Sequence, residues 1–157
     1  YENARFSNMI IETGGRHRRE YPIYVDVDTR FGDGKLGTVR NITFDGLDIR
    51  TRGNILIGGQ AGAPVTGITL SDIRMTVSEA VDLAATAGKP RGNRLQAQRT
   101  GAADFSRDVG HIVLGHAAGA TVRNVIVAPS ADSDRRPVLV ERNTTGTMAD
   151  AALSSRR

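Results

Sequence analysis

Two aspartates stand in the arrangement that an inverting glycosidase uses. Asp26 and Asp28 lie two residues apart at the end of Pro22 to Asp28, where the apolar alternation predicts a strand with both carboxylates facing outward. The Cα atoms of such a pair are about 6.5–7 Å apart, and inverting glycosidases hold their two carboxyl groups roughly 6.5–9.5 Å apart. Any strand with alternating aspartates shows this spacing, so a solvated face or a minor substrate contact is the competing interpretation.

A basic cluster and two aromatic residues flank the same predicted strand. Arg16 and Arg18 belong to a short loop, and the fork of an arginine pairs well with the carboxylate of a sugar acid. Tyr24 and Phe31 carry rings that can stack on a sugar or pack at an edge. We therefore expect these four residues to be the substrate contacts, with an exposed charged loop as the alternative for the arginines.

The histidines are weaker candidates for catalysis. His111 and His116 each follow a glycine late in the chain, where a structural or surface role is the commoner one. Asp26, Asp28 and Asp33 lack the regular ligand spacing and the terminal glutamate of a calcium loop. No phosphate loop, zinc motif or cysteine is present, so we expect neither a cofactor nor a metal.

Composition limits the fold and the partners. The 157 residues are 39% hydrophobic but only 4% aromatic, which suits a core of aliphatic side chains in narrow layers. The formal charge of +4 can attract a polyanion, although the charges are scattered. Aromatic residues do not cluster among the basic ones, so nucleic acid is not an expected partner. No apolar run is long enough for a membrane span or a signal segment.

One sequence pattern recurs along the chain. In each copy, two short segments of alternating apolar and polar residues flank one short residue that tolerates left-handed backbone. The copies are Phe6–Ile11, Ile42–Ile49, Ile68–Met75 and Thr121–Val127. From Phe44 to Leu70 is 26 residues, and from Leu70 to Val122 is 52, which is twice that period. From Phe6 to Phe44 is 38 residues, which we interpret as one repeat with a loop insertion. A fixed period of roughly 20–50 residues is typical of a solenoid.

The repeat predicts an all-β, right-handed parallel β-helix. Alternation places four side chains of the second copy inside and two outside, namely Ile42, Phe44, Leu47 and Ile49 against Thr43 and Asp48. The bend falls on residues that accept left-handed backbone at least cost, namely Asn8, Gly46, Asp72 and Asn124. A single coil cannot bury its own inner face, so the copies must stack.

The helix is expected to cover residues 1–143. Shorter strands at Pro22–Asp28, Asn54–Ile57, Ile112–Leu114 and Val138–Val140 complete the coils. The stretch 78–108 breaks the pattern and is interpreted as a loop insertion, with a short helix at 80–87. The tail 144–157 has no convincing core pattern, and we expect it to be disordered.

Three successive stretches give the chain a specific resemblance. Val39–Ile49, Gly53–Gly59 and Pro64–Ile73 resemble, in this order, the C-terminal coils of polygalacturonase-type enzymes, which are glycoside hydrolases of family 28 with a pectin-lyase-like β-helix. Arg136–Val140 is similar to the last coil of that family. The resemblance covers most of 1–143.

The resemblance implies an inverting hydrolase of pectin-like or related acidic plant cell-wall polysaccharide, extracellular or periplasmic, and we expect a monomer. The family's catalytic motifs, which are Asn-Thr-Asp, Asp-Asp, Gly-His-Gly and Arg-Ile-Lys, are not found in this chain. A tyrosine that contacts substrate in the family corresponds to Phe31, which has no hydroxyl. We therefore expect the chain to be the C-terminal piece of a longer enzyme and inactive alone. The alternatives are a non-catalytic β-helix for binding or structure, and a calcium-dependent lyase of the same fold.

Overall fold

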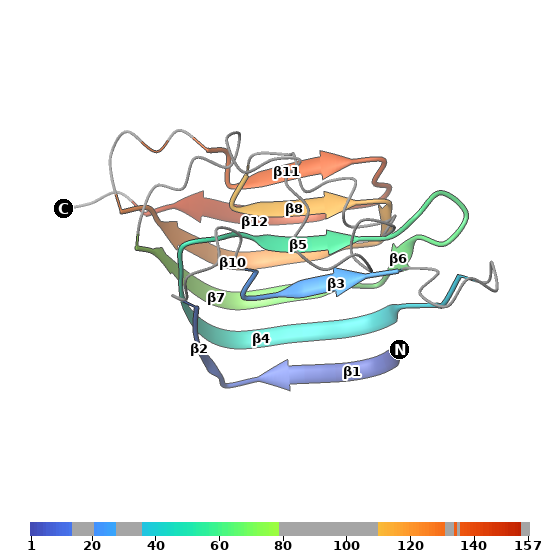
Figure 1. Ribbon diagram of the computed structural model, residues 1–157, viewed down its shortest axis with the longest axis horizontal. Coiled ribbons are helices and arrows are strands. Elements are labelled where there is room, and N and C mark those ends of the chain that lie inside the picture. Colours follow the sequence, from blue (N-terminus) through green and yellow to red (C-terminus); the bar gives the residue numbers. More distant parts are fainter. Residues whose placement is uncertain (14–20, 28–35, 79–109, 131–133, 135, 155–157) are drawn as a thin grey trace, which may run out of the picture.

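The computed structural model describes residues 1–13, 21–27, 36–78, 110–130, 134 and 136–154 (Figure 1). These residues form the strands β1 to β12 and no helix. Accordingly, no helix in this part of the chain is long and apolar enough to cross a membrane. The fold is all-β, as the sequence predicts.

The strands form two sheets, and every pairing between named strands in the described part is parallel. The larger sheet contains β1 (Glu2–Ser7), β2 (Ile10–Glu12), β4 (Arg40–Thr51), β6 (Val65–Thr66), β7 (Thr69–Val77), β9 (Ala117–Ala118), β10 (Thr121–Ala128) and β12 (Met148–Leu153). The smaller sheet contains β3 (Tyr24–Asp26), β5 (Ile55–Gly58), β8 (Ile112–Gly115) and β11 (Leu139–Arg142). The chain visits the two sheets in alternation, and each circuit is called a coil below. Figure 1 shows the coils rising from β1 at one end to β11 and β12 at the other.

The strand register follows the sequence repeat. Phe6 pairs with Phe44, Phe44 with Leu70, and Leu70 with Val122. The copies of the pattern are therefore direct neighbours in the larger sheet. β7 and β10 are hydrogen-bonded to each other with no strand between them, so the 52-residue interval from Leu70 to Val122 corresponds to one coil and not to two. Residues 79–109 between these two strands lie outside the described part, so the loop insertion at 78–108 and the helix at 80–87 stay predictions.

The core lies between the two sheets and is aliphatic. The four residues of β4 that were predicted to face inward are buried, since Ile42, Phe44, Leu47 and Ile49 are at most 9% exposed. The smaller sheet contributes four residues that are 0% exposed, namely Ile55, Ile57, Ile112 and Leu114. Burying one such side chain is worth about 1.5–3 kcal/mol, so stacking of the coils is the main source of stability.

The predicted bends are confirmed. Four stacked residues have left-handed backbone, with φ of 55° at Asn8, 62° at Gly46, 52° at Asp72 and 49° at Asn124. A second column of left-handed residues, which we did not predict, lies five residues earlier in each coil, at Asn3, Asn41, Gly67 and Gly119. Two bends thus bracket each six-residue segment and hold its side chains in phase with those of the neighbouring coils.

The tail differs from its predicted disorder. Met148–Leu153 forms β12, which pairs in parallel with β10. Its side chains are largely exposed, including Met148 at 67% and Leu153 at 46%, and only Ala151 packs against the core. This strand is held mainly by main-chain hydrogen bonds to β10 and not by buried side chains. Its sequence therefore shows little apolar alternation.

Candidate functional site

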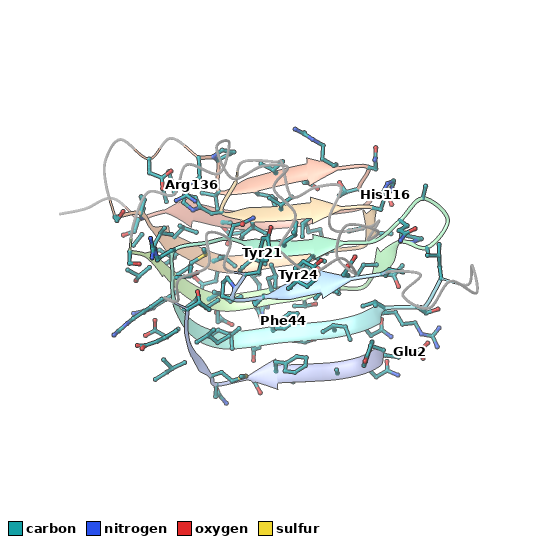
Figure 2. The ribbon with its side chains drawn as sticks, in the orientation of Figure 1. Glu2, Tyr21, Tyr24, Phe44, His116 and Arg136 are labelled. Carbon is teal, nitrogen blue, oxygen red and sulfur yellow. The ribbon has the colours of Figure 1, made fainter. Side chains whose placement is uncertain are left out.

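Two tyrosines and a carboxylate meet on β3 and the residues just before it. The rings of Tyr21 and Tyr24 have centroids 5.3 Å apart and are tilted by 38°. The Tyr24 hydroxyl donates a hydrogen bond to Asp26 Oδ2 over 3.1 Å. Tyr24 is 39% exposed, so part of its ring is open to a ligand. Figure 2 shows the two labelled rings close together in front of the smaller sheet.

The position of β3 at the edge of the smaller sheet makes this site accessible. Tyr24 begins an outward-facing row that continues across the sheet through Leu56, Val113 and Val140. Leu56 is 1% exposed and Val113 is 0% exposed, so the middle of the row is closed to solvent. Tyr21 and Val140 pack against these two residues. Val140 at the far end of the row is half-buried, so Tyr24 is the most exposed residue of the row.

Of the six predicted site residues, two lie in the described part of the chain and four lie outside it. Tyr24 and Asp26 lie next to each other, as two residues of one strand face must. Arg16, Arg18, Asp28 and Phe31 lie outside the described residues, so their roles, including the distance between the two carboxylates, stay predictions.

Tyr21 was missed by the sequence analysis. It precedes Pro22 and falls before the alternating pattern, although its place three residues before Tyr24 was a usable signal. Its ring belongs to the same aromatic pair, so the candidate site is Tyr21, Tyr24 and Asp26.

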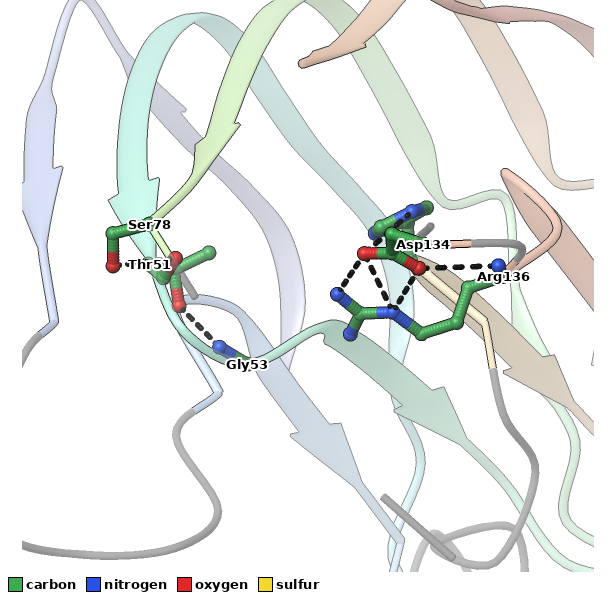
Figure 3. Close-up of polar contacts among 6 residues, drawn as sticks. Thr51, Gly53, Ser78, Asp134 and Arg136 are labelled. Atoms are coloured by element: carbon green, nitrogen blue, oxygen red, sulfur yellow. Dashed lines mark hydrogen bonds and ion pairs between the residues drawn. The ribbon is translucent and has the colours of Figure 1, made fainter. Parts of the chain in front are cut away.

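A second polar group is buried at the start of β8. The Asp134 carboxylate accepts hydrogen bonds from Arg136 Nε at 2.8 and 3.1 Å and from the Arg136 main-chain nitrogen at 3.1 Å. His111 Nε2 lies 3.9 Å from Asp134 Oδ2. All three residues are buried, and no partner within the described part bonds either ring nitrogen of His111 or Nη1 of Arg136. Figure 3 shows this cluster around Asp134.

The cluster has an uneven charge balance. Burial lowers the pKa of His111 to about 4, and the positive charge of Arg136 acts in the same direction while Asp134 opposes it. The hydrogen bonds from Arg136 hold the pKa of Asp134 below its ordinary value. At neutral pH the group is therefore a buried Asp–Arg ion pair beside a neutral imidazole.

His111 and His116 both have a structural environment. His111 is 0% exposed, and its main chain links the coils on either side, since its N–H donates to Pro137 O and its O accepts from Ile55 N. His116 has left-handed backbone with φ of 44°, and its Nε2 lies 3.4 Å from Asn143 Nδ2. Within the described ranges, no group of three or more acidic or histidine side chains is placed to hold a metal ion.

The turn that leads from β4 to the smaller sheet is fixed by a buried threonine. The Thr51 hydroxyl accepts a hydrogen bond from Gly53 N over 2.9 Å and lies 2.6 Å from the Thr13 hydroxyl. Ser78 donates to Thr51 O over 3.4 Å (Figure 3). These bonds link adjacent coils at the corner before β5, the strand next to the tyrosine pair.

The class of protein that the structure defines is an all-β protein with two parallel sheets. Comparison with models of known families, with curated proteins and with solved structures finds no match.

Proposed function

We propose that this chain forms the C-terminal coils of a right-handed parallel β-helix in a polygalacturonase-like glycoside hydrolase, and that β3 carries a sugar-binding surface. The in-register repeats and the two columns of left-handed residues support the β-helix. The observation that carries the function is the pair formed by half-buried Tyr21 and exposed Tyr24, with the Asp26 carboxylate beside Tyr24 on the edge strand β3.

The chemistry of the site suits a polysaccharide. A tyrosine offers a flat apolar face with a polar tip, and the C–H face of a sugar ring can pack on it. The Asp26 carboxylate and the Tyr24 hydroxyl can accept hydrogen bonds from sugar hydroxyls on either side of that ring. Acidic sugars need cationic partners as well, which is the role predicted for Arg16 and Arg18.

Catalysis by this chain alone is not part of the proposal. Inverting hydrolysis needs one carboxylic acid to protonate the leaving oxygen and a second carboxylate to activate water. In this function both would come from coils that are not in this sequence, and the tyrosine pair would hold the substrate at their side. A release of reducing sugar from polygalacturonate by this chain would contradict this part of the proposal.

Tyrosine fluorescence tests the binding directly. The chain has three tyrosines and no tryptophan, so a sugar that packs on Tyr21 or Tyr24 changes most of the signal. Titration with oligogalacturonate is expected to give a saturable change, which Tyr24→Ala reduces at least about tenfold in affinity. Tyr1→Ala is the matched control, because Tyr1 is 95% exposed and outside the site. If Tyr24→Ala binds as well as the unmodified chain, the proposed surface is wrong.

A non-catalytic β-helix module for binding or structure is the second candidate. The tyrosine pair beside Asp26 would serve such a module as well, because it is a binding surface that needs no catalytic group. The sequence encoded just before Tyr1 distinguishes the two candidates. Gly-His-Gly and Arg-Ile-Lys motifs there would favour the hydrolase, and a repeat without them would favour the module.

A further inference from the structure

Both sheets end in open edge strands at one end of the stack. β1 and β2 pair with β4, and β3 pairs with β5, and none of the three has a strand on its other side in the described part. Figure 1 shows β1 as the lowest strand. Apolar side chains are exposed at this edge, with Phe6 at 45% and Met9 at 42%. Proteins normally cover or blunt such an edge, because its free main-chain groups attract further strands.

The edge has the inward pattern of an interior coil. Ala4 pairs with Ile42 and Phe6 with Phe44, so β1 continues the buried columns. The rings of Phe6 and Phe44 are stacked, with centroids 5.2 Å apart and planes 12° apart. Phe44 is covered on both sides and is 9% exposed, whereas Phe6 is covered on one side only. One more layer of apolar residues would bury Phe6 to the same degree.

The side-chain ladders have a direction that extends beyond this edge. Asn41 Nδ2 donates to Asn3 Oδ1 over 3.0 Å, and Asn124 Nδ2 donates to Asp72 Oδ1 over 2.6 Å. In both bonds the donor belongs to the later coil and the acceptor to the earlier one. By the same rule, the Asn3 amide nitrogen is the donor directed away from β4, toward the open side of β1. The Asn8 amide has the same orientation, because its Oδ1 faces the later coil and would lie 3.0 Å from a Cβ placed on Gly46.

We propose that the β1–β2 edge binds one further coil, an extended segment parallel to β1 with asparagine or aspartate opposite both Asn3 and Asn8. Apolar residues of this segment lie opposite Ala4 and Phe6. The six-residue pattern is thus an amide or carboxylate, an apolar residue, any residue, an apolar residue, any residue, and a second amide or carboxylate. Asn3–Asn8 has this pattern itself, and Asn41–Gly46 differs from it only in its final glycine.

A second copy of this chain fits the edge less well. The end of the stack opposite β1 is formed by β12, whose register against β10 shifts between Val122 and Val125. The column of Asn8, Gly46, Asp72 and Asn124 has no left-handed member in β12. The top of one copy therefore lacks the second bend that the bottom of another would need. This inference rests on the proposed β-helix, and it does not depend on sugar binding.

A fusion protein tests the docking. The segment Asn41–Thr51, with Gly46→Asn, is placed before Tyr1 on a Gly/Ser linker of about 25 residues, which has an r.m.s. span of about 25–30 Å. The control fusion has the same composition with its apolar and polar positions exchanged, which turns the apolar side chains to the wrong face. We expect amide hydrogen exchange in β1 to be at least about tenfold slower in the first fusion than in the control.

Two variants test the ladder in the same fusion. Asn3→Gly keeps the left-handed backbone and removes the amide, so it is expected to lose much of the protection in β1. Asn143→Gly, also left-handed with φ of 54° but near the other end of the stack, is expected to change nothing there. Equal exchange in the two fusions would overturn the proposal. So would concentration-dependent protection of β1 in the unmodified chain with dimers in sedimentation, since a second copy would then occupy the edge.

Discussion

The buried histidine predicts a specific dependence of stability on pH. The pKa of His111 is lowered from 6.5 to about 4 in the folded chain, chiefly because its ring is buried. In the unfolded chain the ring is in water and its pKa returns to about 6.5. Between these two values the unfolded state binds a proton that the folded state does not. The free energy of unfolding therefore falls as the pH falls through this window.

The magnitude follows from the width of the window. One group contributes about 1.36 kcal/mol per pH unit, so the loss from about pH 6.5 to about pH 4 is about 3 kcal/mol. Asp134 acts in a lower range. Its pKa is held below 3.8 by Arg136, so the stability that it contributes is complete above this value and is lost only as the pH falls further. The two effects separate if measurements stop at about pH 4.5.

Urea unfolding followed by circular dichroism, at several pH values from about 7 to 4.5, measures this loss. The variant His111→Leu removes the titrating ring without orphaning a hydrogen-bond partner, since none of the described residues bonds the ring. We expect its free energy of unfolding to fall less steeply than that of the unmodified chain, by about 1 kcal/mol per pH unit. Ile126→Ala, at an exposed residue without an ionisable group, is the control and should keep the original slope. Parallel slopes for His111→Leu and the unmodified chain would refute the reasoning.

Two matched pairs of substitutions test the packing by urea unfolding at neutral pH. Both Gly67→Ala and Gly119→Ala put a side chain on left-handed backbone, which costs about 1–2 kcal/mol. Only at Gly67 would the new Cβ also lie 2.7 Å from Asn41 Oδ1. Gly67→Ala should therefore lower the free energy of unfolding more than Gly119→Ala. Equal losses would mean that the Asn41 side chain moves away without cost. Ile49→Ala should lower the free energy of unfolding by about 2–5 kcal/mol because the side chain is 0% exposed. Ile126→Ala, at a residue 40% exposed, should change it by no more than about 0.5 kcal/mol, and similar losses at both positions would contradict the burial.

The repeat was predictable because its signals are local. The inward positions of Phe44 and Leu70 follow from two-residue alternation, and the bends at Gly46 and Asp72 follow from residue types that tolerate positive φ. Aligning the copies was then enough to predict that Phe44 pairs with Leu70. The second column of bends escaped because Asn41 stands at the beginning of its segment, where no change of alternation marks it.

The candidate site was predictable only in part. Tyr24 and Asp26 share a strand, so their proximity follows from spacing alone. Tyr21 joins them through the path of the chain around Pro22, which no periodic pattern describes. The grouping of His111 with Asp134 and Arg136 was not visible, because 23 residues separate His111 from Asp134 and a stacked coil brings them together.

The sequence by itself determined the class of fold, the inward and outward faces of the repeated strands and one column of bends. These depend on backbone preferences and on residues that are near neighbours in the chain. Only the tertiary structure decided that β7 lies directly against β10, that 148–153 is a strand, and which polar groups are buried together. These depend on contacts between coils, whose partners are separated by loops of unequal length. It also showed that the tyrosine pair lies on an edge strand at the open end of the stack.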